Sequence, residues 1–130
     1  MSAEEIPTPP IRVLIADDHA LFAEALEAIL GQDPRVEVVG RASNGREAVD
    51  LALALEPTIT LMDISMPRMD GIEATRLIRE ALPNAAVLML TGSNSSVDVD
   101  RARKAGVAGY ITKDRIAAHL IEAIVEIACR

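Results

Sequence analysis

Short apolar segments and segments with helical periodicity alternate along this chain, and each kind occurs five times. Two parallel strands cannot be joined by a tight turn, because the chain must cross back to the starting edge, usually through a helix. The alternation therefore predicts an α/β fold: a parallel sheet with helices on both faces, in a three-layer doubly wound arrangement. The predicted strands are residues 11–16, 36–40, 58–62, 86–90 and 109–112.

Apolar residues at three- and four-residue spacing predict helices over residues 19–30, 44–55, 70–82, 95–106 and 115–128. Asn44 and Glu47 predict a capping box at the second helix, and Asp70 predicts a cap on the third. In the first three helices the residues expected to point inward are Phe22, Ala25, Leu26, Ile29 and Leu30, then Ala48, Leu51, Ala52 and Leu55, then Ala74, Leu77, Ile78, Ala81 and Leu82.

Acidic residues stand where two of the predicted strands end. Asp17 and Asp18 follow the first strand, and Asp63 follows the third. If these strands are neighbours, the three carboxylates meet at one edge and repel each other unless a cation lies between them. A hard divalent cation such as Mg²⁺ fits oxygen ligands best. Thr91 and Lys113 follow the fourth and fifth strands, and they add the hydroxyl and ammonium groups that a transferring phosphoryl group requires.

Composition narrows the class of protein further. A chain of 130 residues fits one compact domain, and its net charge of −7 argues against direct nucleic-acid binding by this segment. Residues 1–10 are acidic and proline-rich, so we expect a disordered tail, not a signal peptide, before a domain of residues 11–130. The single cysteine, Cys129, excludes an internal disulfide and suits a reducing compartment. No apolar run approaches the ~18 residues of a membrane span.

The ordered set of strand-end residues resembles the receiver domain of two-component response regulators, over about residues 11–127. The resemblance is carried by Asp17-Asp18, Asp63-Ile64-Ser65-Met66-Pro67, Asp70-Gly71, Thr91-Gly92 and Tyr110-Ile111-Thr112-Lys113. Residues 16–19 and 109–114 look most like the branch in which a C-terminal helix-turn-helix DNA-binding domain follows the receiver. The resemblance implies a flavodoxin-like sheet with strand order 2-1-3-4-5, in which ligands bind beside strands 1 and 3.

Roles for the strand-end residues follow from this resemblance. Asp63 would be the phosphoacceptor that takes a phosphoryl group from a sensor histidine kinase. Asp18, Asp63 and the backbone carbonyl of Ser65 would ligate Mg²⁺, and Asp17 would complete the site directly or through water. Lys113 would pair with Asp63 before phosphorylation and contact a phosphoryl oxygen afterwards.

The resemblance also implies a conformational switch. Thr91 would donate its hydroxyl to the phosphate, and Tyr110 would then move in behind it. Ser65 and Ser93 would tune the lifetime of the phosphorylated state. One departure bears on the site: Asp114 follows Lys113, where many relatives have proline.

The implied function is that of a cytoplasmic phosphoacceptor domain that controls transcription. It would not be an enzyme, since it would catalyse only its own phosphorylation and dephosphorylation. The expected partner is a sensor histidine kinase, and no membrane contact is expected. A homodimer and a C-terminal DNA-binding domain outside this chain are left open.

Other readings compete with this one. Taken singly, Asp18 could be a helix cap, Asp63 a loop residue and Tyr110 a half-buried strand residue. A haloacid-dehalogenase-like phosphatase would place its acidic pair late and would have Asp, not Ser65, two residues after the nucleophile. A flavodoxin-like cofactor binder would need a hydroxyl- and glycine-rich loop where Asp17 stands. A receiver kept only for protein contacts would not need the complete Asp, Thr and Lys set.

The last predicted helix has more apolar surface than one-sided burial requires. Its first stripe, expected to face the sheet, is Ile116, Leu120, Ala123, Ile124 and Ile127, and the adjoining second stripe is Ala117, Ile121, Val125 and Ala128. Either the first helix covers the second stripe, or the stripe docks a second copy or an output domain.

His19 and His119 are expected to be exposed and outside the metal and phosphoryl-transfer sets.

Overall fold

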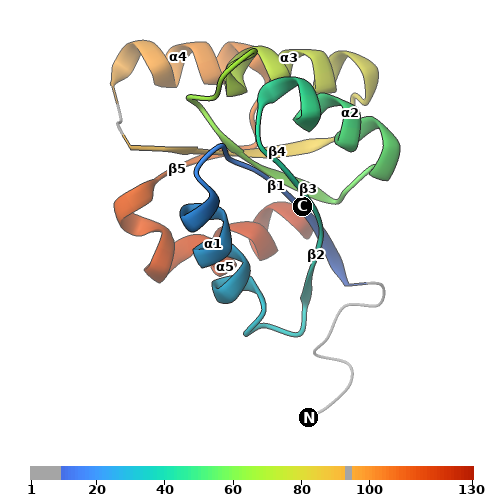
Figure 1. Cartoon of the computed structure of the whole chain (residues 1–130), viewed down its shortest axis with the longest axis vertical. Coiled ribbons are helices and arrows are strands. Elements are labelled where there is room, and N and C mark those ends of the chain that lie inside the picture. Colours follow the sequence, from blue (N-terminus) through green and yellow to red (C-terminus); the bar gives the residue numbers. More distant parts are fainter. Residues whose placement is uncertain (1–9, 93–94) are drawn as a thin grey trace.

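Five parallel strands form one sheet in this computed structural model, which describes residues 10–92 and 95–130 (Figure 1). The order is β2-β1-β3-β4-β5, so the predicted fold class and the strand order implied by the resemblance are both confirmed. The strands are β1 (Ile11–Ala16), β2 (Val36–Ala42), β3 (Ile59–Asp63), β4 (Ala86–Thr91) and β5 (Gly109–Thr112). Of the tail predicted for residues 1–10, all but Pro10 lies outside the described residues.

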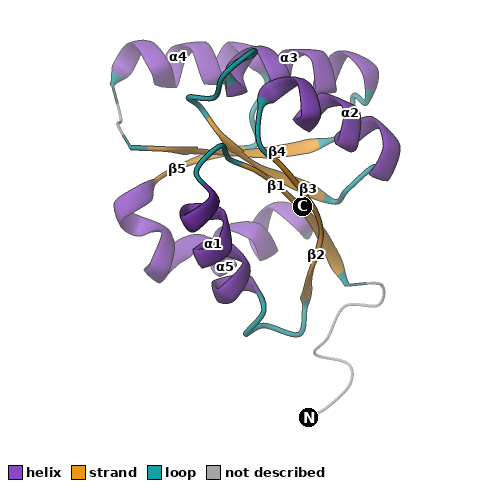
Figure 2. Cartoon of the chain, in the orientation of Figure 1, coloured by secondary structure: helices purple, strands orange, loops and turns teal. Residues whose placement is uncertain are grey.

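Helices follow the strands and cover both faces of the sheet (Figures 1 and 2). They are α1 (Ala20–Leu30), α2 (Gly45–Leu55), α3 (Gly71–Ala81), α4 (Ser96–Ala105) and α5 (Ile116–Ala128), with a short 3₁₀ turn, η2 (Lys113–Arg115), before α5. Helices α1 and α5 lie on one face, and α2, α3 and α4 lie on the other. None of the helices in the described ranges has the length and apolar character needed to cross a bilayer.

Each face of the sheet has its own hydrophobic core. Along β1, Val13 and Ile15 pack toward α1 and α5, whereas Leu14 and Ala16 pack toward the opposite layer. Burial on both faces explains why the strands read as continuous apolar runs. Met62 and Met89 are fully buried. These two methionines therefore fill space in the core, which suits their flexible apolar side chains.

Two alanines expected to point inward are exposed: Ala25 and Ala81. In α1 the buried residues are Ala23, Leu26 and Leu30, so the inward face is rotated toward residue 23. Ala81 lies on the same side of α3 as Ala74 but is the last residue of the helix, where packing ends. The small size of alanine explains both errors, because its burial contributes little and the larger residues set the orientation of the helix.

Side-chain caps fix where α2 and α3 begin. Asn44 Oδ1 accepts a hydrogen bond of 2.9 Å from the backbone N–H of Glu47, as predicted. The carboxylate of Glu47 accepts in return from the N–H of Ser43 at 2.7 Å, one residue earlier than a capping box places this bond. Asp70 Oδ1 accepts from the N–H of Glu73 at 2.8 Å, which confirms the cap on α3.

The start of α3 is pressed against the end of β3. The N–H of Gly71 donates to the carbonyl of Ile64 at 2.8 Å. A Cβ atom on Gly71 would lie 2.1 Å from the carbonyl oxygen of Asp63, closer than any real contact. Glycine is therefore required here for close approach of two backbone segments, and this approach fixes the loop that follows Asp63.

We predict that Gly71→Ala lowers the free energy of unfolding by about 1–3 kcal/mol, because the added methyl group must displace backbone. Urea unfolding followed by circular dichroism measures this loss. The matched control is Gly92→Ala, since a Cβ on Gly92 would meet nothing within 4 Å. Equal losses in the two variants would show that close approach is not the reason for glycine at residue 71.

Candidate functional site

The register of the sheet brings the predicted site residues to one edge. Ala16 pairs with Met62, so the next residues, Asp17 just after β1 and Asp63 at the end of β3, lie at the same level. On the other side of β3, Asp63 pairs with Leu90, and Thr91 is the next residue. Thr91 pairs in turn with Thr112, which precedes Lys113. The carboxyl ends of β1, β3, β4 and β5 thus supply two carboxylates, a hydroxyl and an ammonium group.

Burial distinguishes the members of the acidic cluster. Asp17 and Asp63 are only 3% and 2% exposed, whereas the side chain of Asp18 is 28% exposed at the rim. Ligand atoms of Asp17, Asp18, Asp63 and His19 all lie within 4.8 Å of one another. The predicted meeting of three carboxylates is therefore present, and a histidine that the sequence prediction set aside lies with them.

Lys113 faces the two buried carboxylates. Its Nζ lies 3.5 Å from Asp63 Oδ1 and 3.8 Å from Asp17 Oδ2, so the predicted pairing with Asp63 is present although Asp114 replaces proline. The ammonium group also lies 4.4 Å from the ring centroid of Phe22, the chain's single phenylalanine. The sequence prediction assigned Phe22 to the core alone. Its ring attracts the cation and helps to hold the lysine in place.

The pKa of Asp63 is raised above its usual value of 3.8. Burial is the largest cause, because it disfavours the charged form, and the nearby charge of Asp17 acts in the same direction. Lys113 and a hydrogen bond from the backbone N–H of Ser65 oppose the increase. The fold therefore disfavours the charged form of Asp63, and a bound cation would stabilise that form.

The residues present fit a hard divalent cation. Asp17 Oδ2 and Asp63 Oδ2 are buried and accept no hydrogen bond from the described residues. Buried oxygens without donors are costly, and carboxylate oxygens are the ligands that Mg²⁺ prefers. The contribution of the Ser65 carbonyl stays a prediction, and the side chain of Ser65 is exposed.

A cavity of about 470 Å³ opens beside the cluster. Its lining is Asp18, Ile64, Ser65, Met66, Pro67, Asp70, Asp98 and Arg101. Arg101 of α4 lies 3.3 Å from Asp70 and 3.8 Å from Asp98, so the wall of the cavity joins α3 to α4. A reactant could approach the rim of the acidic cluster through this opening.

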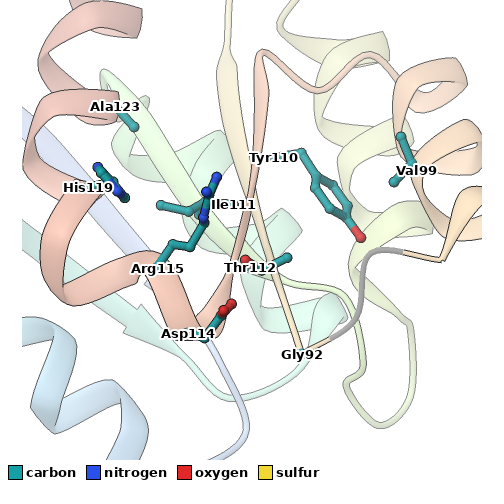
Figure 3. A pocket seen from close by; sticks show the side chains of 9 residues that line it. All are labelled: Gly92, Val99, Tyr110, Ile111, Thr112, Asp114, Arg115, His119 and Ala123. Atoms are coloured by element: carbon teal, nitrogen blue, oxygen red, sulfur yellow. The ribbon is translucent and has the colours of Figure 1, made fainter.

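The predicted switch residues lie on the β4 and β5 side of the site. Thr91 is buried at the end of β4, and Tyr110 is half-buried on β5. Tyr110 lines a second cavity of about 980 Å³, where Figure 3 shows it and Val99 on one side and Arg115 and His119 on the other. Movement of either switch residue stays a prediction. Ser93, expected to tune the phosphorylated state, lies outside the described residues.

We predict that Asp63→Asn stabilises the metal-free protein at about pH 7. Below the usual pKa of 3.8 this carboxyl group is protonated in both states and adds no penalty. As the pH rises through the raised pKa of the folded state, the buried group must ionise and stability is lost, by about 1.4 kcal/mol for each pKa unit.

Urea unfolding in EDTA, at several pH values between about 3 and 8, measures the difference between wild type and Asp63→Asn. The difference should shrink as the solution is acidified. A difference that stays constant with pH would mean that packing, and not ionisation of Asp63, is responsible.

Comparisons with known proteins agree with this geometry. Residues 13–125 match the response regulator receiver domain family. The chain is 38% identical over 125 residues to the transcriptional regulatory protein DegU of Brevibacillus brevis, covering 96% of this chain and 53% of that protein. It is 40% identical over 114 residues to the response regulator protein VraR of Staphylococcus aureus, covering 88% and 54%. The chain thus spans about half the length of the curated relatives it matches.

Solved structures show the same fold. The signal receiver domain of the response regulator NarL from Mycobacterium tuberculosis superposes with a TM-score of 0.88 and 32% identity, covering 92% of this chain and 97% of that one. A LuxR-family two-component response regulator from Aurantimonas sp. SI85-9A1 gives a TM-score of 0.88 and 34% identity, covering 92% and 86%. With a family match from residue 13 to residue 125, the chain belongs to the receiver domain family of response regulators.

Proposed function

We propose that this chain receives a phosphoryl group on Asp63 from the phosphohistidine of a sensor histidine kinase. The observation that carries the proposal is the state of Asp63: a buried strand-end carboxylate with one oxygen 3.5 Å from Lys113 and the other without a hydrogen-bond donor. A carboxylate held in this way can act as a nucleophile toward phosphorus.

In the proposed reaction, a carboxylate oxygen of Asp63 attacks the phosphorus atom in line with the leaving imidazole. The P–O bond forms as the P–N bond breaks, and the bonding pair stays on the imidazole nitrogen of the kinase. Lys113 is placed to balance the negative charge on a phosphoryl oxygen. Mg²⁺ would be held by Asp18, Asp63 and the backbone carbonyl of Ser65, with Asp17 completing the site directly or through water, and it would neutralise further charge on the phosphoryl group.

Ionisation of Asp63 is a condition for this chemistry, since the protonated acid is a poor nucleophile. Burial raises the pKa of Asp63, while Lys113 and the N–H of Ser65 lower it. Lys113 and the N–H of Ser65 therefore favour the ionised form that the reaction requires, against the effect of burial. The acidic rim formed by Asp18 stays open to the cavity, where a cation can enter.

The phosphorylated state would alter the β4–β5 side of the molecule. Thr91 follows Leu90, the residue that pairs with Asp63, and its hydroxyl would donate a hydrogen bond to the phosphoryl group. Tyr110 lines the cavity on the β5 side. A local bond of this kind shifts the populations of two conformations of a surface. We propose that this surface regulates transcription from the cytoplasm, and that the chain catalyses only its own phosphorylation and dephosphorylation.

A C-terminal DNA-binding domain is the proposed route to transcription. The chain itself has a net charge of −7, which does not suit direct contact with phosphate backbones. Relatives that are named as transcriptional or DNA-binding regulators support an output domain beyond the receiver. We propose the helix-turn-helix type, following the resemblance at residues 16–19 and 109–114.

We predict that acetyl phosphate and Mg²⁺ add one hydroxylamine-labile phosphoryl group to the chain, and that Asp63→Asn abolishes it. Intact-mass spectrometry measures the added mass before and after hydroxylamine. The matched control is Asp70→Asn, because asparagine also caps helices and should leave labelling intact. Labelling of Asp63→Asn at the wild-type level would exclude this phosphoacceptor, and a wild-type chain without labelling would favour a receiver kept only for protein contacts.

The same assay tests the metal. Asp18→Ala should lose the Mg²⁺-dependent part of the labelling while the protein stays folded, because Asp18 lies at the rim and its removal relieves repulsion. Mg²⁺ titration by isothermal calorimetry gives the affinity directly. Wild-type affinity in Asp18→Ala would contradict the assigned ligand.

The second stripe of α5 is only partly covered. Ile121, Val125 and Ala128 are half-buried and pack against the core, whereas Ala117 is exposed. We propose that this exposed end takes part in a homodimer, so Ala117→Glu should lower the sedimentation coefficient at high protein concentration. Ala54→Glu, an exposed change on α2, is the control. A wild-type chain that sediments as a monomer at every concentration would rule the dimer out.

A further inference from the structure

His19 is the side chain in the acidic cluster to which the proposed function gives no role. It precedes α1, and its side chain is 67% exposed, as the sequence predicted. Its Nδ1 atom nevertheless lies 3.3 Å from Asp17 Oδ1 and 3.2 Å from Asp18 Oδ1. Nδ1 is therefore directed at the carboxylates, although most of the ring is open to solvent.

The backbone helps to hold His19 there. Its N–H donates to Asp17 Oδ1 at 2.8 Å, so the main chain folds back over the buried carboxylate and carries the ring with it. The imidazole follows Asp17 by only two residues, and this short connection limits how far it can move away. Its position is thus fixed by the same loop that positions Asp17 and Asp18.

The separations agree with those of ligands on one metal ion. Two ligand atoms that are each about 2.1 Å from an ion lie roughly 3.0 Å apart at a right angle and roughly 3.4 Å apart at the tetrahedral angle. The distances of 3.2 and 3.3 Å from Nδ1 to the two carboxylate oxygens fall between these values. All four ligand atoms lie within 4.8 Å of one another, so a modest contraction would bring them onto a single ion.

A second observation also points to a ligand. The two buried oxygens, Asp17 Oδ2 and Asp63 Oδ2, accept no hydrogen bond from the described residues, and their side chains are almost completely buried. Both residues belong to the same cluster as His19. A cation would satisfy them, and the nature of the fourth ligand then decides which cation binds best.

Imidazole and carboxylate favour different metals. Carboxylates suit Mg²⁺, Ca²⁺ and Mn²⁺, whereas imidazole suits the later first-row ions and Zn²⁺. We propose that His19 Nδ1 is a fourth ligand of this site, and that it makes the site bind a first-row transition-metal ion or Zn²⁺ in addition to Mg²⁺. The inference rests on the acidic metal site of the proposed function, and it adds a ligand and a class of metal to that site.

A competing role for His19 is that of a counter-ion. A protonated imidazole beside two carboxylates would neutralise part of the cluster and would have to be displaced by any metal. The two roles have opposite consequences for His19→Ala. Loss of a ligand weakens binding of an imidazole-preferring metal, whereas loss of a counter-ion strengthens binding of every divalent cation.

The experiment uses Co²⁺ as the probe and Mg²⁺ as the reference, with both affinities measured at one fixed pH of about 8. All proteins carry Cys129→Ser, because the exposed thiol could itself bind Co²⁺. Loss of an outer-sphere partner already weakens metal binding about 10–100-fold, so His19→Ala should weaken Co²⁺ binding by at least about tenfold. The Mg²⁺ affinity should change by less than about threefold, because Mg²⁺ prefers oxygen ligands.

His119→Ala is the matched control. This histidine is also exposed and lies 3.9 Å from one carboxylate, that of Glu122 on α5, but it is outside the cluster. It should leave both affinities unchanged. A direct readout comes from proton NMR of the Co²⁺ protein, in which imidazole signals shifted by the paramagnetic ion should be present in wild type and absent in His19→Ala.

Unchanged Co²⁺ affinity in His19→Ala, or tighter binding of both metals, would overturn the assignment of His19 as a ligand. These outcomes are separate from a failure of the proposed function. If Asp63 is labelled and Mg²⁺ binds in wild type while His19→Ala has no effect on Co²⁺, only the histidine ligand is wrong. If neither metal binds wild type, the acidic metal site itself is wrong.

Discussion

The structure of the site depends on two carboxylates buried side by side at the ends of β1 and β3. Asp17 and Asp63 are nearly inaccessible, and each repels the other. Lys113 reaches both carboxylates from the end of β5 and offsets part of this repulsion, and the partly exposed Asp18 leaves the rim of the cluster open. Three further features surround the two carboxylates: the Lys113 ammonium group over the ring of Phe22, the His19 imidazole beside the acids, and two carboxylate oxygens without hydrogen-bond donors among the described residues.

Pattern alone predicts much of this arrangement. The alternation of strand and helix fixes a parallel sheet, and acids at the ends of the first and third strands must then meet if those strands are neighbours. The strand order came from the family resemblance, and the structure has that order. Lys113 reached its predicted partner although Asp114 replaces proline, because the strand register, and not the following residue, sets the level at which β5 ends.

The features that the sequence did not reveal are those that depend on close packing between distant segments. Nothing in residues 70–72 indicates that a Cβ on Gly71 would collide with Asp63, since the collision arises only when α3 folds onto β3. The contact between Phe22 and Lys113 joins residues that are far apart in the sequence. The sequence pattern places Phe22 on the inward face of a helix, which predicts only a core residue and no contact with a lysine. Ala25 and Ala81 show a second limit of sequence patterns. Helical periodicity predicted that both would point inward, but it does not show whether a neighbouring element covers them, and both are exposed.

The position of Tyr110 has a practical consequence. The chain contains one tyrosine and no tryptophan, so nearly all of its ultraviolet emission comes from a single ring on β5. That ring lines the cavity between α4 and α5 and lies one strand away from the buried Thr91 (Figure 3). This chain therefore contains one intrinsic fluorophore, beside the surface at which the proposed change of state would occur. Its emission spectrum and quenching report on that surface without any added label.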